Sequence, residues 1–308
     1  MPRRSGFYAV LTVLILGGVA VLPGEIEQDV SLSSVLEIWG DILRDVDQFG
    51  LKLTRVSDRE EMQVGKEISA LMSAREKQDI HLAKYVSAVG QALVPHVKRP
   101  GIQYEFHVIE ADWMVNAFAL PGGQIYVTTG MLEFLRSEAE LAAILGHEIS
   151  HVDLRHCIER YQYELTLRKV GAKPVGQLAE IARRLVAMEY GKYQELEADA
   201  HGIRLSIQAG YDPEAGPAVF DRLKRHFRES IPPKAKTPVG EIFEVLGDAA
   251  DSYFRSHPPS AERMRRLDGL VAKHRARLAG GLFYVGVENY RQRIPRAQKE
   301  FSGEQRRM

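Results

Sequence analysis

The chain has 308 residues, with 41 basic and 41 acidic side chains and a formal net charge of zero. This balance argues against a nucleic-acid-binding protein that works by bulk positive charge, and against an acidic disordered tail. The mean hydropathy of −0.22 excludes a membrane protein with several spans, and the single cysteine, Cys157, excludes an intramolecular disulfide framework.

The first segment, residues 1–24, has the pattern of a signal peptide. Arg3 and Arg4 precede an uncharged run rich in valine and leucine, which ends at Pro23 and Gly24. The run is slightly shorter than the ~20 residues that a spanning helix needs, and no clear cleavage site of small residues follows it. A cleaved signal peptide and a retained N-terminal anchor are therefore both open. In either case we expect an exported protein, periplasmic or membrane-anchored, and any membrane contact would be made through this segment.

The next part of the chain has helical periodicity. Apolar side chains recur at helical intervals over 32–53, so residues 25–60 are expected to form a helical lead-in. Residues 60–75 and 79–97 predict two further amphipathic helices.

The period then changes to that of strands. Apolar and polar side chains alternate at 104–108, and two further short strands are predicted at 115–120 and 124–129. Pro121–Gly123 supplies the turn between the last two. From residue 131 onward the pattern is helical again. The sequence therefore predicts an α+β fold, mostly helical, with a small antiparallel sheet.

The motif with the clearest chemistry is HEISH at 147–151. A capping-box sequence shortly before it begins a helix, so His147 and His151 lie one turn apart on one face, about 6 Å along the axis. Glu148 stands beside the first histidine and can hold a metal-bound water, which makes this the HExxH zinc signature. His156 and Cys157 follow the motif, and at 100° per residue neither shares the face of His151, so both are expected to be structural.

Two histidines are too few for zinc, which takes three protein ligands in a catalytic site. Glu195 and Asp199 are also four residues apart, so they share one face of a second helix. We expect Glu195 to be the third ligand and Asp199 to accept a hydrogen bond from a ligand histidine. His201 is an alternative ligand that lies off this face, and Glu197 is expected to be structural.

The last third of the chain carries two less informative segments. Three prolines at 230–240 predict a surface loop. Residues 271–308 contain several arginines after Gly280 and are expected to form a basic, solvated C-terminal tail.

HEISH at 147–151 followed by ELEAD at 195–199 resembles the HtpX-like family of zinc metallopeptidases, which are gluzincins with HExxH and a later ExxxD. The family includes a CAAX-prenyl-protease type and a BepA-like periplasmic type. Because this chain has one N-terminal hydrophobic run, it is similar to the periplasmic type and not to the integral-membrane branch. Four further segments are similar to the family in the same order: VNAFALPGGQIYVTTGML at 115–132, HVDLRH at 151–156, AGYDPEAG at 209–216 and SHPPSAERMRRL at 256–267.

The resemblance implies a zincin-like metallopeptidase domain over 61–270, with the small sheet beside the HExxH helix. It implies an endopeptidase that holds one Zn²⁺ per chain, in which Glu148 is the general base that activates the zinc-bound water. It also implies that substrate adds as an extra strand to the edge formed by Asn116, Ala117 and Phe118.

His257 is the open question in the late His-Pro motif. It is expected either to stabilise the oxyanion or to occupy the fourth zinc position in a latent state, and the alternative is a loop histidine bonded to backbone. Arg263 is a weaker candidate for a charge that faces the site, or for a structural ion pair.

The expected partners are polypeptides, in the form of extended or misfolded cell-envelope proteins, and not nucleic acids. The alternatives are a chaperone-like binding module for envelope assembly and a narrow processing peptidase. The intact Glu148 favours an enzyme, because a pure binding module has no need of a general base.

Overall fold

The computed structural model describes residues 56–72, 76, 79–169, 185, 190–229, 253, 257, 261–278 and 280–307. All of these residues belong to one compact unit, Arg55–Met308. The predictions for the signal segment at 1–24, the helix over 32–53 and the loop at 230–240 lie outside the described residues. Within the described ranges, no helix has both the length and the apolar character needed to cross a bilayer.

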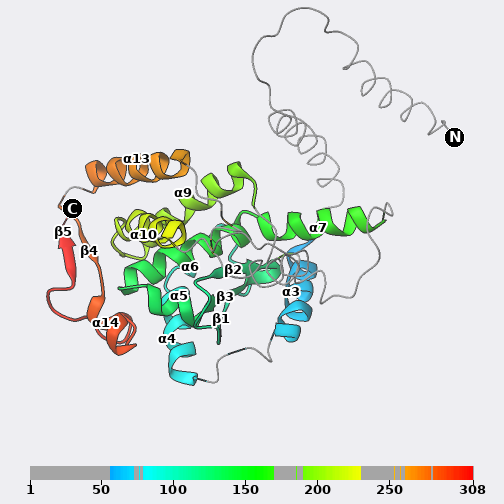
Figure 1. Cartoon of the computed structure of the whole chain (residues 1–308), viewed down its shortest axis with the longest axis horizontal. Helices are drawn as coiled ribbons and strands as arrows, with labels where there is room; N and C mark the ends of the chain where they lie inside the picture. The colour runs from blue at the N-terminus through cyan, green and yellow to red at the C-terminus, as the bar shows by residue number, and fades with distance from the viewer. Residues whose placement is uncertain are drawn as a thin grey trace, which may run out of the picture. The chain divides into compact units, whose positions relative to one another are not determined.

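A small sheet lies at the centre of the unit (Figure 1). Its strands are β1 (Glu105–Ile109), β2 (Ala117–Leu120) and β3 (Gln124–Thr128), in the order β1-β3-β2. β3 is antiparallel to β2 but parallel to β1, so the sheet is mixed. The expected α+β class is confirmed, whereas the expectation of an antiparallel sheet is wrong for the β1–β3 pair. Each connection reverses the chain, so β1 and β3 run the same way, and β3 rather than β2 became the neighbour of β1.

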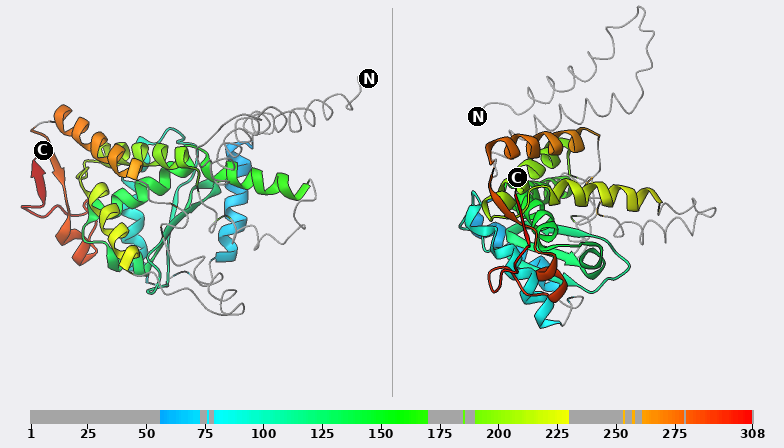
Figure 2. Two further views of the ribbon diagram at one scale, coloured as in Figure 1. Left: turned by 45° about the horizontal axis from the view of Figure 1, so that its top comes forward. Right: turned by 90° about the vertical axis from the view of Figure 1, so that its left-hand side faces the viewer.

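The helices surround this sheet, and the C-terminal part adds a two-stranded ribbon. The remaining elements in chain order are α3 (Asp58–Met72), α4 (Ile80–Gln91), η2 (Val94–His96), η3 (Pro121–Gly123), α5 (Thr129–Phe134), α6 (Glu138–Asp153), α7 (His156–Lys169), α9 (Lys192–Gln208), α10 (Ala215–Glu229), α13 (Ala261–Arg277), β4 (Leu282–Tyr284), α14 (Val287–Gln292) and β5 (Gln305–Arg307). α13 lies against α9 and α10, as Figure 1 and Figure 2 show from three sides.

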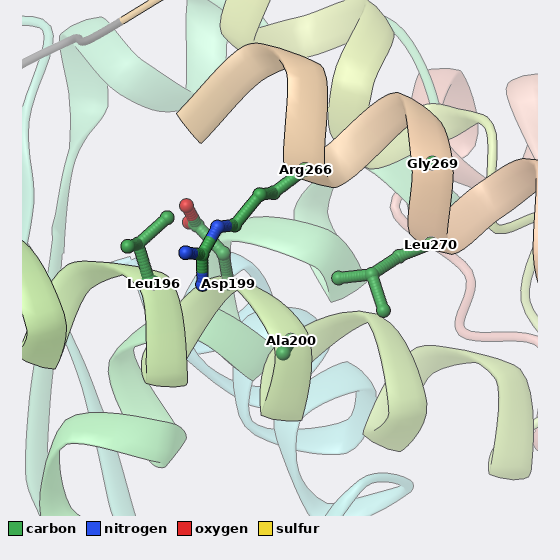
Figure 3. A pocket seen from close by; sticks show the side chains of 6 residues that line it. All are labelled: Leu196, Asp199, Ala200, Arg266, Gly269 and Leu270. Atoms are coloured by element: carbon green, nitrogen blue, oxygen red, sulfur yellow. The ribbon is translucent and has the colours of Figure 1, made fainter. Parts of the chain in front are cut away.

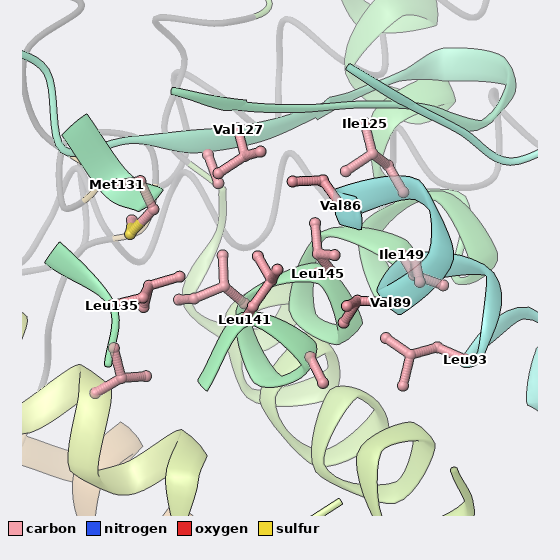
Figure 4. Packing of buried hydrophobic residues seen from close by; sticks show 14 of the residues in the cluster. Val86, Val89, Leu93, Ile125, Val127, Met131, Leu135, Leu141, Leu145 and Ile149 are labelled. Atoms are coloured by element: carbon pink, nitrogen blue, oxygen red, sulfur yellow. The ribbon is translucent and has the colours of Figure 1, made fainter. Parts of the chain in front are cut away.

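Helix α6 is the central element, because it packs on the sheet, on α4, on α9 and on α10. Its apolar side chains meet those of α4 and β3 in the main core (Figure 4). Burying each of these side chains contributes on the order of 1.5–3 kcal/mol, so α6 is held firmly in place. The side chains that fill this core include Val86, Val89, Ile125, Val127, Leu141, Leu145 and Ile149.

Helices α6 and α9 approach each other at two glycines. A Cβ atom on Gly202 would stand 2.9 Å from the backbone nitrogen of His147 and 3.0 Å from the carbonyl carbon of Gly146. Only glycine fits at this distance, so the backbones of the two helices are nearly in contact. This close crossing brings the face of α6 that carries the HExxH histidines against α9.

The C-terminal segment is folded onto the start of α6. The carbonyl groups of Val285 and Gly286 accept hydrogen bonds from the first backbone N–H groups of α6, and Tyr290 donates to the carbonyl of Leu132. The expectation of a solvated tail is therefore wrong for 283–290, where Phe283, Tyr284 and Tyr290 are buried, whereas most residues of 297–307 are exposed. The predicted limits of the peptidase domain stay a prediction.

Candidate metal centre

The α6 helix positions the two motif histidines. Ser137 caps its N-terminus by accepting a hydrogen bond from the backbone N–H of Glu140, so the helix begins where the sequence predicts. One turn separates His147 from His151 near the C-terminal end, and both rings are buried. Their Nε2 atoms lie 3.1 Å apart, so the two rings point to one place.

Two further side chains join them from other parts of the chain. Nδ1 of His257 lies 3.1 Å from Nε2 of His147 and 2.9 Å from Oε1 of Glu195, which projects from α9. The ligand atoms of His147, His151, Glu195 and His257 all lie within 4.8 Å of one another, and the four residues are buried. The structure therefore brings together three imidazoles and one carboxylate.

The chemistry of this set fits a metal ion. Burial lowers the pKa of all three imidazoles, so each is neutral near pH 7 and has one nitrogen that carries a lone pair. Ligand atoms about 2.1 Å from a tetrahedral zinc would be roughly 3.4 Å apart. Five of the six pairs of ligands are separated by 2.9 to 3.6 Å, and all the ligand atoms lie within 4.8 Å of one another. A zinc ion thus suits both the spacing and the ligand types.

A buried guanidinium supports the ligands from behind. Arg263 on α13 forms a two-pronged ion pair with Asp199, at 2.8 Å for each contact, and its Nη1 lies 2.5 Å from Oε2 of Glu195. The same Nη1 donates to the carbonyl of His257 at 3.1 Å. Asp199 in turn lies 3.1 Å from Nδ1 of His147. Arg263 therefore connects the carboxylate of the cluster, the carboxylate behind it and the His257 backbone.

The charges of the two carboxylates differ. Burial raises the pKa of Glu195 to about 7, even though Arg263 pulls it down. For Asp199, burial is outweighed by the ion pair with Arg263, and its pKa falls to about 2. Asp199 is therefore ionised at all physiological pH values, and it suits an acceptor for the Nδ1–H group of His147.

Glu148 stands at the edge of the cluster. It is fully buried, and its Oε1 lies 3.5 Å from Nε2 of His257. Burial, reinforced by the nearby Glu195, raises the pKa of its carboxyl well above the usual value. A carboxylate with a raised pKa is a stronger base than an exposed one, which suits a group that takes a proton from water.

The predicted substrate edge lies at the start of β2. Asn116, Ala117 and Phe118 are buried, and β2 is an edge of the sheet that packs on α6. The backbone N–H of Tyr253 donates to the carbonyl of Val115, just before β2, at 3.2 Å. The role of Asn116, Ala117 and Phe118 in binding substrate stays a prediction.

Two aromatic side chains at the centre were missed by the sequence reasoning. The ring of Tyr190 stacks on His151 with centroids 3.6 Å apart, and Tyr253 stacks on His257 at 4.5 Å. The backbone N–H of His257 donates a hydrogen bond to the carbonyl of Tyr253 at 3.1 Å, which links these two residues. The only available signal was that Tyr253 precedes His257 by four residues.

His156, which the sequence predicts to be structural, lies directly behind His151. Its Nδ1 atom lies 3.1 Å from Nδ1 of His151. The extrapolation at 100° per residue fails because α6 ends at Asp153, and Arg155 has a left-handed backbone with φ 70°. The turn directs His156 back towards His151.

Cys157 is buried on α7, beside the hydroxyl of Tyr190, and burial raises the pKa of its thiol to about 12.

A cavity of about 320 Å³ lies between α9 and α13 (Figure 3). Asp199 and Arg266 supply its charged groups, and its other walls are mostly apolar. This cavity offers one acidic and one basic residue rather than a converging set of ligands. The His/Glu cluster is therefore the stronger candidate for the catalytic site.

Comparison with known proteins gives one family match and several relatives. The sequence profile of Peptidase family M48 matches residues 81–271. The chain is 31% identical over 175 residues to mitochondrial metalloendopeptidase OMA1 of Arabidopsis thaliana, covering 54% of this chain and 31% of that protein. It is 30% identical over 169 residues to the beta-barrel assembly-enhancing protease of Escherichia coli, covering 49% of this chain and 34% of that protein. Against metalloprotease LoiP of Escherichia coli it is 27% identical over 196 residues, covering 60% and 69%. The chain thus spans about a third of the length of the first two of these relatives.

Proposed function

The chain belongs to peptidase family M48, a family of metalloendopeptidases, and on this premise we propose that it is a zinc-dependent endopeptidase acting on extended or misfolded cell-envelope proteins. The observation that carries the proposal is the convergence of His147, His151 and Glu195 beside the buried carboxyl of Glu148. Zinc, when bound, supplies a water of lowered pKa and polarises the peptide carbonyl.

The protein's own residues divide the remaining work. His147, His151 and Glu195 hold the metal, and Asp199 fixes the ring of His147 through its Nδ1 atom. Glu148 takes the proton of the attacking water and delivers it to the leaving amine. Its raised pKa supports the first step, because a carboxylate of higher pKa is a stronger base towards water.

The substrate class is inferred from the edge strand. An extended peptide would pair through its backbone with the chain at Asn116–Phe118, next to α6, and such pairing tolerates many sequences. This favours unfolded segments over one fixed sequence. The signal-like segment at 1–24 supports a periplasmic or membrane-anchored location, and the name of one relative, a beta-barrel assembly-enhancing protease, agrees with an envelope role.

His257 is proposed to occupy the fourth position of the metal in a latent state. Its Nδ1 faces the other ligands, and the backbone N–H of Tyr253, four residues earlier, donates to the carbonyl of Val115 beside the proposed substrate edge. Substrate would therefore have to displace both residues. For His257→Ala we expect one fewer nitrogen ligand by zinc-edge spectroscopy and an altered rate of cleavage. An unchanged ligand number and an unchanged rate would show that His257 is a loop histidine.

The test of the function is cleavage of reduced, unfolded casein and of a folded protein by the purified full chain. We expect zinc-dependent cleavage of casein that a chelator abolishes and added zinc restores, with little cleavage of the folded protein. Tight binding of casein without cleavage would support the chaperone-like alternative instead. Cleavage confined to one bond of one protein would support a narrow processing peptidase.

A further inference from the structure

A chain of contacts leads from one motif histidine to the protein surface. Nδ1 of His151 lies 3.1 Å from Nδ1 of His156, and Nε2 of His156 lies 3.4 Å from Oε2 of Glu197. The two histidines are buried, whereas the side chain of Glu197 is 67% exposed. None of these contacts is used by the mechanism above.

The positions of protons along this chain follow from the chemistry of imidazole. Nε2 of His151 faces the cluster, 3.1 Å from Nε2 of His147, so it must keep its lone pair for a metal. A neutral imidazole has one N–H, and that of His151 must then be on Nδ1. Two facing nitrogens can bond only if one donates and the other accepts, so Nδ1 of His156 is the acceptor. Its own N–H is therefore on Nε2 and points to Glu197.

We propose that His156 is a positioning residue for the metal centre, which accepts the Nδ1 proton of His151 and so directs Nε2 of His151 to the ion, while Glu197 fixes the tautomer of His156. The inference rests on the proposed function in that it takes His151 as a zinc ligand.

The two motif histidines are then held in parallel ways. His147 has a direct carboxylate partner, Asp199, at 3.1 Å. His151 has an imidazole between it and its carboxylate, Glu197. Partners of this kind keep the ring of a ligand in one tautomer and one orientation, and losing one costs metal affinity.

Local structure explains why His156 reaches this place. α6 ends at Asp153, and the left-handed backbone of Arg155 returns the chain so that α7 begins at His156. Glu197 lies on α9, two residues after the ligand Glu195 and on a different side of the helix, where it reaches His156 from outside.

The test compares zinc dissociation constants of full-length variants by competition with a chromophoric chelator. His156→Leu removes the acceptor and should weaken zinc binding by about 10- to 100-fold. His156→Asn places its amide oxygen where Nδ1 was and should restore affinity to within about threefold of the wild type. His156→Gln places its amide near the former Nε2 and should remain weak. Glu197→Leu should cause a smaller loss, because water can replace an exposed acceptor.

His201→Leu is the matched control. His201 is equally buried, but it bonds to Asp153 and makes no described contact with the cluster. The His201→Leu substitution should lower the unfolding temperature and leave the zinc affinity unchanged.

The proposal is overturned if His156→Leu binds zinc as tightly as the wild type, or if the Asn and Gln variants are equally weak. Should His156→Leu not fold, the contrast between the Asn and Gln variants decides. If the wild type binds zinc but cleaves no polypeptide, the proposed function fails while the order of affinities still tests the role of His156.

Discussion

Replacing Arg263 by methionine should destabilise the zinc-free protein more than any substitution of an exposed arginine. The change keeps the length of the side chain and removes the guanidinium that contacts Asp199 and Glu195. The Arg263 side chain is 5% exposed, and those of Asp199 and Glu195 are 3% and 1% exposed, so water cannot replace it. Removing one partner of such a buried pair costs about 3–5 kcal/mol of unfolding free energy.

The pKa of Asp199 points to the same interaction. Burial alone would raise this pKa, yet the ion pair with Arg263, together with the contact to His147, brings it down from 3.8 to about 2. Because the folded-state pKa is depressed, this stability is fully present above pH 4 and is lost as the pH falls through 2. The difference corresponds to roughly 2–3 kcal/mol at neutral pH, which agrees with the lower end of the range above.

The assay is equilibrium unfolding in urea of the chelator-treated protein at pH 7. The control is Arg266→Met, since Arg266 lies on the same helix, its side chain is 58% exposed, and its guanidinium pairs with Glu262 at 2.9 Å on the surface. The control should lose less than about 1 kcal/mol. The reasoning is refuted if Arg263→Met costs no more than Arg266→Met.

Two further predictions concern the metal ligands and the helix crossing. Zinc affinity should rise by about tenfold per pH unit between about pH 5 and 7, because Glu195, with its pKa raised to about 7 by burial, must lose a proton to bind the ion; a flat profile in chelator competition would contradict this. Gly202→Ala should cost about 1–3 kcal/mol and weaken zinc binding, since the added Cβ meets the backbone of His147 at 2.9 Å. Gly269→Ala, where nothing lies within 4 Å, should instead stabilise α13 by up to about 1 kcal/mol, and equal thermal shifts in the two variants would argue against close helix contact.

Much of the cluster follows from helical spacing. A separation of four residues puts His147 with His151, and Glu195 with Asp199, on single faces of two helices, and the structure brings these faces together. The spacing could not show that α6 and α9 cross at a glycine pair, which is a matter of tertiary packing. It also could not place His257, because a residue in a Pro-rich stretch has no period to read.

The failures share a physical cause, which is that local patterns do not report where the chain turns. The left-handed backbone at Arg155 placed His156 behind His151, against the helical extrapolation. The pairing of β1 with β3 depended on strand order, which alternation of side chains does not determine. The arginines of the C-terminal segment led to the prediction of a solvated tail, although Tyr284 and Tyr290 are buried among them.

Glu148→Gln provides the most direct test of the central claim. The substitution keeps the shape of the side chain and removes its ability to take a proton, while the metal ligands stay in place. The variant should bind one zinc per chain with wild-type affinity and cleave unfolded casein at least about 10²-fold more slowly. Cleavage by the fully zinc-loaded variant at the wild-type rate would contradict the assignment of Glu148 as the general base of a zinc peptidase.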